Sequence, residues 1–440
     1  MIFAFENISK QENFIESTKV EKLPDGFQRL QVCPTASTMI RYWRTGQEFE
    51  NFEFKDFDVI RAFHAKDKYI ISTGVNHSPE QWVGKIAKNY FYRDDGIEFK
   101  SIFEWLSPKY MKDLQEGRAM LMLDQSHEGY QRDWLWNYFH DECTKYDINP
   151  KAIIYITGNG EADKQYQTWC NTHNLQNRMC VAPLFHFENM IYTTHEFGNF
   201  RGLDVAPTFE ENVEYKTNNK TWTYNLLQKR QRSHRLWIYK RIVEEGLLDK
   251  GLCSMQPFIQ YNTYMFGNFM TEEEVEELNK YLPLEPNGEG ANNFSDLIYI
   301  QKFNKDTVLQ SYLSIVSEAS FNDEDLTCFI SEKTFKALAS HTPFMIYGNR
   351  NSLQHLKDMG YETFSDFIDE SYDTMADRER LEKVVDNIKQ IDKIENKLAW
   401  YKDMKPILEH NFWTLKRNSR DLAPQAYIKI QNAWREYFNV

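Results

Sequence analysis

The stretch that decides the fold runs from residue 311 to residue 348 and reads SYLSIVSEASFNDEDLTCFISEKTFKALASHTPFMIYG. An apolar run of strand length, Tyr312–Ser317, is followed by a polar loop, a helical run over Ser331–Ser340 and a second short strand over Pro343–Tyr347. Apolar strands separated by helices are typical of a parallel sheet that is covered on both faces. This segment therefore predicts a strand, a helix and a strand of an α/β domain.

The same alternation extends over most of the chain. Before residue 190, strands are expected at Tyr69–Thr73, Ala119–Asp124 and Ala152–Thr157, with a one-sided apolar helix over Arg132–Lys145. The elements expected after residue 220 are strands at Leu252–Met255 and Leu297–Gln301, and helices over Ser233–Glu245, Glu272–Tyr281 and Ser352–Met359. The sequence therefore predicts two α/β domains that face one another across a cleft, because ligand clefts form at the carboxyl ends of parallel strands.

A polar segment separates the two predicted domains. Residues 198–220 contain Gly, Pro and Asn and are typical of a linker. Helical runs are expected near the C-terminus, over Asp377–Asp403 and Gln425–Phe438. The predicted organisation is an N-terminal domain over residues 1–205, a second domain over 206–400, and C-terminal helices over 401–440 that pack back across both domains.

The composition indicates a globular protein with an acidic balance of charge. The 440 residues contain 52 Lys and Arg against 65 Asp and Glu, and the formal net charge of −13 disfavours coating of nucleic acid or anionic membrane. No apolar run reaches the length of about 18 residues that crosses a bilayer, and no secretory leader is recognisable. The six cysteines form no CxxC pair, so we expect reduced thiols, a cytoplasmic protein and no membrane partner.

Two clusters raise the question of a metal, and neither predicts one. Cys170, His173 and Cys180 lack a fourth ligand at a suitable spacing. The acidic run Asp323-Glu324-Asp325 is of the kind that holds Mg²⁺ or Mn²⁺ against a diphosphate, but three adjacent acids in a polar loop are usually only solvated. We therefore expect a metal-independent protein. The sequence also contains no P-loop, no strand-borne dinucleotide motif and no nucleophile elbow.

The start of the helical run at Ser331 carries groups that suit an anionic ligand. Ser331 is a natural N-cap, and a helix N-terminus offers free N–H groups and the positive end of the helix dipole. Lys333 adds a full positive charge, and Glu332 can accept hydrogen bonds from the hydroxyls of a ribose or a sugar. The alternative is an ordinary helix start with a surface Glu–Lys pair.

The segments Ser331–Ala337 (SEKTFKA) and Pro343–Gly348 (PFMIYG) resemble the donor-binding signature of GT-B glycosyltransferases. The resemblance is to the inverting fucosyltransferase-like enzymes, and residues 349–373 also resemble phage-encoded glycosyltransferase-like proteins. It implies a GT-B fold, in which two Rossmann-like domains face one another across a cleft, with a helical C-terminal tail. It also implies that Glu332 and Lys333 contact the ribose, sugar and phosphates of a nucleotide sugar.

A cationic segment precedes this signature, within Leu226–Ser254. It contains Arg230, Arg232 and Arg235, and no acidic residue follows Lys229 until Glu244. The resemblance to the fucosyltransferase-like family implies that Arg235 binds the donor diphosphate, a task that suits the rigid two-pronged guanidinium group. A solvated basic helix and a nucleic-acid-binding patch are the alternatives.

Inverting transfer needs a base that removes a proton from the acceptor hydroxyl. In a GT-B arrangement this base usually comes from the N-terminal domain, where Asp124 and Glu128 follow a predicted strand. Glu128 is the first candidate, Asp124 the second and His127 a third, while the acidic–His pairs at His186–Glu188 and His195–Glu196 rank lower. Each carboxylate could instead cap the following helix.

Taken together, the residues and the resemblance predict transfer of a sugar from a nucleotide-sugar donor to an acceptor hydroxyl, with inversion. The nucleotide sugar is a co-substrate, and no other cofactor is expected. Two acceptors stay open, a glycan and a hydroxylated pyrimidine in phage DNA. The alternative functions are a nucleotide-sugar epimerase and a non-catalytic nucleotide-sugar-binding protein with the same fold.

Overall fold

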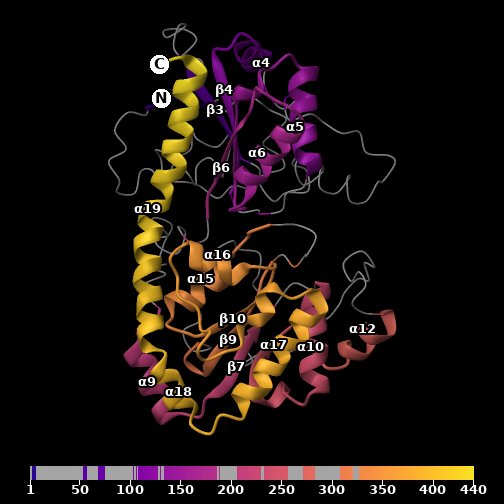
Figure 1. Ribbon diagram of the computed structural model, residues 1–440, viewed down its shortest axis with the longest axis vertical. Helices are drawn as coiled ribbons and strands as arrows, with labels where there is room; N and C mark the ends of the chain where they lie inside the picture. Colours follow the sequence, from indigo (N-terminus) through magenta and orange to yellow (C-terminus); the bar gives the residue numbers. More distant parts are fainter. Residues whose placement is uncertain are drawn as a thin grey trace. The chain divides into compact units, whose positions relative to one another are not determined.

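A computed structural model describes residues 2–5, 53–56, 68–74, 103, 106, 108–126, 129, 133–185, 188, 206–228, 232–255, 271–282, 308–319, 321 and 327–440. The chain divides into two compact units (Figure 1). Unit 1 consists of Met1–His186 together with Asp421–Val440, and unit 2 consists of Phe187–Arg420.

Unit 1 is built on a six-stranded parallel sheet. Its strands are β1 (Ile2–Phe5), β2 (Glu53–Asp56), β3 (Tyr69–Gly74), β4 (Ala119–Gln125), β5 (Ile153–Thr157) and β6 (Cys180–Pro183), in the order β2-β1-β3-β4-β5-β6. The α-helices before β6 in the described part of this unit are α4 (Pro108–Gln115), α5 (Asp133–Lys145) and α6 (Ala162–Thr172). Alternate residues of the apolar strands enter two separate buried clusters, one containing α5 and α6 and one containing the C-terminal helix, so both faces of the sheet are covered.

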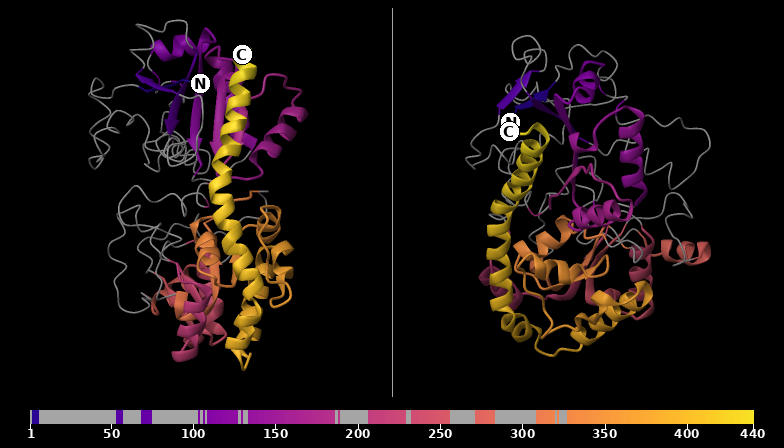
Figure 2. Two further views of the ribbon diagram at one scale, coloured as in Figure 1. Left: turned by 90° about the vertical axis from the view of Figure 1, so that its left-hand side faces the viewer. Right: turned by 45° about the horizontal axis from the view of Figure 1, so that its top comes forward.

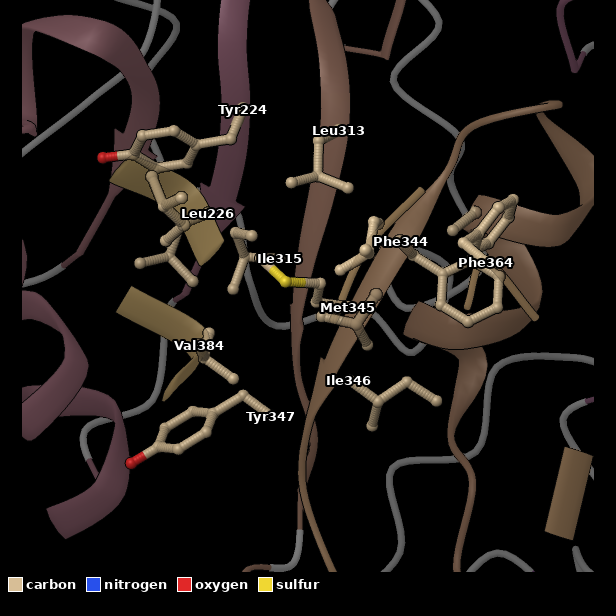
Figure 3. Close-up of a cluster of buried hydrophobic side chains, with 14 of the residues drawn as sticks. Tyr224, Leu226, Leu313, Ile315, Phe344, Met345, Ile346, Tyr347, Phe364 and Val384 are labelled. Carbon is tan, nitrogen blue, oxygen red and sulfur yellow. The ribbon is translucent and has the colours of Figure 1, made fainter. Parts of the chain in front are cut away.

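Unit 2 is built on a four-stranded parallel sheet. Its strands are β7 (Trp222–Leu227), β8 (Gly251–Ser254), β9 (Ser311–Ser317) and β10 (Phe344–Tyr347), in the order β10-β9-β7-β8. Its helices include α9 (Phe209–Asn218), α10 (Ser233–Glu244), α12 (Glu272–Asn279), α15 (Glu332–Ala339), α16 (Ser352–Asp358), α17 (Asp377–Asp392) and α18 (Lys397–Asp403). Figure 3 shows the core of this unit, with Tyr347 and Val384 on one side of β10 and Phe344 and Phe364 on the other.

Both sheets have a doubly wound topology. Numbered along the chain within each unit, the strands of unit 2 are ordered 2-1-3-4, and the sheet of unit 1 begins in the same way. In unit 2, the connection from β7 through α10 leads to one edge and the connection from β9 through α15 leads to the other. The order therefore reverses between β7 and β9, and ligands of doubly wound sheets bind at the carboxyl ends of the strands at such a switch point.

The predicted α/β class, with two parallel-sheet units and a helical C-terminal tail, is confirmed. The tail ends in α19 (Lys405–Phe438), a single long helix that Figure 2 shows in yellow. Its residues up to Arg420 belong to unit 2, and those from Asp421 belong to unit 1. There Ile430 and Trp434 pack against the unit 1 sheet.

Two expectations on local structure differ from the structure or fall outside it. Residues 198–220 were expected as a linker, but α9 occupies part of them. Thr208 begins this helix with a capping box to Glu211, and Phe209 is buried, so polar composition concealed a capped amphipathic helix. The strand expected at Leu297–Gln301 lies outside the described residues.

Gly251, at the start of β8, provides a test of the packing in unit 2. A Cβ atom there would lie 2.3 Å from Cζ of Tyr224. The Tyr224 ring is fully buried and its hydroxyl donates to the Leu247 carbonyl at 3.0 Å, so it cannot easily move. We expect Gly251→Ala to lower the free energy of unfolding in denaturant by about 1–3 kcal/mol. Gly246→Asn should cost less, because Gly246 has φ +66° and open space around it. Equal stabilities of Gly251→Ala and wild type would contradict the packing.

Candidate functional site

Glu318, directly after β9, is bonded to two cationic segments. These are the start of α10, with Arg232 and Arg235, and the start of α15, with Lys333. The main-chain carbonyl of Glu318 accepts hydrogen bonds from His234 Nε2 and Arg235 Nη2, each at 3.1 Å. Its carboxyl Oε1 accepts from the backbone N–H of Ser331 at 3.1 Å and from the Thr334 hydroxyl at 2.7 Å. The start of α10 and the start of α15 therefore meet at the switch point of the unit 2 sheet.

The start of α15 has the local geometry that its sequence predicts. Ser331 has an extended backbone and caps the helix, since its Oγ accepts from the backbone N–H of Lys333 at 3.4 Å. The ammonium group of Lys333 donates to Ser331 Oγ at 3.2 Å and to Glu332 Oε1 at 2.7 Å. Glu332 is buried and the Lys333 side chain is partly exposed, so a positive charge faces outward from the helix N-terminus.

Positive charges from both segments influence the pKa of one buried histidine, His234. Burial lowers the pKa of His234 well below its usual value, and the positive charges of Arg235, Arg232 and Lys333 contribute in the same direction. The His234 ring is therefore neutral, stacked on Phe321 with ring centroids 5.1 Å apart. Cations from both segments thus lie within electrostatic reach of one imidazole.

Glu332 is held in its ionised form beside two lysines. Burial opposes ionisation of Glu332, but the charges of Lys333 and Lys336 outweigh it, and the pKa of the carboxyl is lowered. Burial also lowers the pKa of Lys336, to about 8, although Glu332 counteracts this effect. The buried Glu332 carboxylate therefore lies within the influence of two amines, Lys333 in the first turn of α15 and Lys336 in its last turn.

Three further residues support the site and were not singled out by the sequence analysis: Glu318, Gly348 and Arg380. The sequence signal for Glu318 is an acidic residue directly after an apolar strand. Gly348 lets Glu318 approach, since a Cβ atom on Gly348 would lie 2.9 Å from Glu318 Cβ. The guanidinium of Arg380 is fully buried and donates to the carbonyls of Gly348 at 2.5 Å and Met375 at 2.9 Å.

The structure brings several of the expected site residues together. Arg235 and Ser331 are bonded to Glu318, and Glu332 and Lys333 directly follow Ser331 at the start of α15. Arg235 is buried, and its Nη2 donates to the carbonyls of Ser317 and Glu318. One nitrogen of the guanidinium group therefore fixes the backbone at the end of β9. Arg232 is the half-buried N-cap residue of α10.

Other expected residues lie outside the described part of the chain. These are Arg230, His127, Glu128, the acidic run at 323–325 and the pair at 195–196. Asp124 is described only by its backbone, which pairs with Gly74 and Ile156 in the unit 1 sheet.

The run of residues that resembles phage-encoded proteins has a structural role at two of its positions. Asp373 accepts hydrogen bonds from the backbone N–H groups of Leu353 and Gln354, and so caps the start of α16. Glu370 accepts from the backbone N–H of Phe364 at 2.6 Å. Both acids therefore accept hydrogen bonds from backbone N–H groups and stabilise the chain that follows β10.

Glu188, which ranked low as a candidate base, is fully buried in unit 2 and accepts a hydrogen bond from the Tyr361 hydroxyl. Burial raises its pKa from 4.5 to about 7, although hydrogen bonds from Tyr361 and Asn418 act in the opposite direction. The folded state then binds more protons than the unfolded state between about pH 4.5 and 7.

We therefore expect the free energy of unfolding to fall by about 3 kcal/mol as the pH rises through this window. Denaturant titrations at several pH values measure this dependence. Glu188→Gln should remove that component, whereas the exposed Glu362→Gln should keep it. An unaltered pH dependence in Glu188→Gln would refute the assignment.

The described residues contain no group of three or more His, Cys, Asp or Glu side chains that could hold a metal ion. Five of the cysteines are described, and each of these is a free thiol. In the part of the chain that the structure describes, no helix has both the length and the apolar character needed to cross a membrane.

Comparison with known proteins gives distant similarities of fold only. No family model and no curated protein matches the sequence. Among solved structures, the chain is similar to a Glycosylation Associate Protein (Gap123) complex from Streptococcus agalactiae, at 8% identity and a TM-score of 0.31, with 88% of this chain and 60% of that chain covered. The present chain thus spans less than two thirds of that protein.

Two trehalose-6-phosphate proteins are also similar to the chain. An alpha,alpha-trehalose 6-phosphate synthase from Burkholderia multivorans matches at 10% identity and a TM-score of 0.39, over 80% of this chain and 81% of that one. A trehalose-6-phosphate protein from E. coli, bound with UDP-2-fluoro glucose, matches at 9% identity and a TM-score of 0.36, over 96% and 99%. The α/β fold class follows from the strand order of the two sheets.

Proposed function

We propose that this protein is a nucleotide-sugar-dependent glycosyltransferase that binds its donor in unit 2. The observation that carries the proposal is the meeting of two cationic segments at the switch point between β7 and β9, joined by Glu318. A nucleotide sugar combines a diphosphate with hydroxylated rings, so it needs cations beside a carboxylate. Lys333 and Glu332, bonded at 2.7 Å, supply that combination.

The proposed chemistry is direct displacement at the donor sugar, with inversion and without a metal ion. A base, Glu128 or Asp124, takes the proton of the acceptor hydroxyl as its oxygen bonds to the sugar carbon. The bond from that carbon to the diphosphate breaks, and the diphosphate leaves with the electron pair. Arg230, Arg232, Arg235 and Lys333 stabilise its charge, while Ser331 and the N-terminus of α15 offer hydrogen bonds.

The acceptor is either a glycan or a hydroxylated pyrimidine in phage DNA. Because phosphate contacts release counterions, acceptor binding that weakens steeply with salt would favour DNA, and salt-insensitive turnover would favour a glycan. We expect the protein to act in the cytoplasm.

A panel of nucleotide sugars tests the proposal. UDP-glucose, UDP-N-acetylglucosamine, GDP-mannose and GDP-fucose are added to the purified protein, and the melting temperature and nucleoside diphosphate release are measured. At least one of them should raise the melting temperature and be consumed with an acceptor. If the donor alone is converted to its epimer, the protein is an epimerase, and if binding occurs without turnover, it is a binding protein. If no member of the panel binds, the proposal is wrong.

A further inference from the structure

Two buried polar side chains at the switch point of unit 2 have no hydrogen-bonding partner among the residues that the structure describes. Gln228 directly follows β7 and Ser317 ends β9, and they are 4% and 2% exposed. Within the described part of the chain, the amide oxygen and nitrogen of Gln228 and the hydroxyl of Ser317 make no hydrogen bond. Each such buried group left unpaired costs about 1–3 kcal/mol, so the pair needs an explanation.

The two side chains lie next to one another on the same face of the sheet. The parallel ladder pairs Asn225 with Ser314, and three further residues along each strand bring Gln228 beside Ser317, on strands about 4.8 Å apart. Ser317 is also in register with Tyr347, whose ring contacts His234 of α10. The unpaired amide and hydroxyl therefore lie on the α10 side of the sheet, beside the carbonyls that Arg235 contacts.

The backbones of both residues are firmly held, in contrast to their side chains. The backbone N–H of Gln228 donates to the Ser254 carbonyl at 3.1 Å, and the Ser254 hydroxyl donates to the Gln228 carbonyl at 3.2 Å. The Ser317 carbonyl accepts from Arg235 at 3.2 Å. These backbone hydrogen bonds fix where the two side chains lie, while the side-chain polar atoms have no hydrogen-bonding partner in the described part of the chain.

A second amide in the same sheet shows what a purely structural role looks like. Three residues earlier on β7, the Asn225 amide donates to Ser311 Oγ at 2.7 Å and accepts from the Ser314 hydroxyl at 3.0 Å. That network of one amide and two serines is closed. Gln228 and Ser317 also combine an amide with a hydroxyl, at the carboxyl ends of β7 and β9. Among the described residues, these groups make no hydrogen bond.

We propose that Gln228 and Ser317 form a subsite for the hydroxyl groups of the donor sugar, an inference that rests on the proposed function. Both side chains are neutral, and each can donate and accept a hydrogen bond, as a hydroxyl can. A polyhydroxylated ring satisfies all of their polar atoms at once, whereas the diphosphate is drawn to Lys333 and the other cations. Gln228 and Ser317 are therefore specificity-determining residues for the sugar.

The test uses Gln228→Met, which keeps the length of the side chain and removes its polar atoms. In the absence of ligand, this variant should melt at the same temperature as wild type or higher, since an unpaired amide has been removed. It should bind the best nucleotide sugar of the panel at least about tenfold more weakly, and bind the matching nucleoside diphosphate as wild type does. Ser317→Ala should act in the same direction.

The matched control is Asn225→Leu, which removes a satisfied amide and should lower the melting temperature of the free protein. A lower melting temperature of Gln228→Met without ligand would show that the amide has a structural partner and would overturn the inference. Unchanged affinity for the nucleotide sugar, or an equal loss for the diphosphate alone, would also overturn it while leaving the proposed function intact.

If wild type binds no nucleotide sugar, the proposed function fails by itself. The subsite is then judged with glucose and mannose at high millimolar concentration. A stabilisation of wild type that Gln228→Met abolishes supports the subsite, and its absence overturns it.

Discussion

Replacing Lys333 with alanine is expected to lower the turnover of the nucleotide sugar by about 10²–10³-fold. The ammonium group lies at the N-terminus of α15, bonded to Ser331 and Glu332, with 29% of its side chain exposed. Under the proposed function, its loss removes a cation that stabilises the leaving diphosphate. It also leaves the Glu332 carboxylate less well neutralised, so that the carboxylate repels the ligand.

The stability of Lys333→Ala should change little, because ion pairs between partly exposed groups contribute about 1 kcal/mol or less. This separates a loss of turnover from a loss of folding. Lys357→Ala is the matched control, since Lys357 is a partly exposed lysine of α16 that pairs with Glu370 at 3.5 Å, outside the site. Full activity of Lys333→Ala towards a donor that wild type consumes would contradict its role at the diphosphate.

Replacing Glu318 with alanine is expected to have the largest effect on unit 2, lowering the free energy of unfolding by about 3–5 kcal/mol. Glu318 is 1% exposed, and its carboxyl group satisfies the buried backbone N–H of Ser331 and the Thr334 hydroxyl. Without it, both donors lose a partner inside the protein. The start of α15 then detaches from β9, and donor binding should fall with stability.

Denaturant unfolding and a binding titration on the same preparations measure both effects. Glu318→Gln keeps one acceptor oxygen and should recover part of the stability. Glu362→Ala is the control, because the Glu362 side chain is 52% exposed. Wild-type stability in Glu318→Ala would mean that Glu318 does not hold the two segments together.

Secondary structure could be predicted from the sequence where the hydrophobic pattern was strong. The strand expected at Tyr312–Ser317 is part of β9, and the helix expected over Ser331–Ser340 contains α15. The helix α9 was missed, because its capping residues Thr208 and Glu211 are of types that also occur in linkers. Local patterns therefore sufficed for buried strands and failed where a helix has only a narrow apolar face.

The candidate site could be predicted only in part. The anion-binding character of Ser331, Glu332 and Lys333 follows from their order at a helix start, which is a local property. Glu318 was not identified, because its importance comes from hydrogen bonds to residues 13 and 16 positions away and to the start of α10. Such contacts have no periodic signature in the sequence.

What the sequence determined by itself was the succession of strands and helices, and with it the α/β class, because hydrophobic periodicity reports which face of each element is buried. Tertiary structure alone decided the order of the strands, which places the reversal between β7 and β9. It also decided which polar side chains are paired, since the Asn225 amide is bonded to two serines, while the Gln228 amide has no partner among the described residues. Strand order and hydrogen-bond pairing depend on residues far apart in the chain, and only folding brings those residues together.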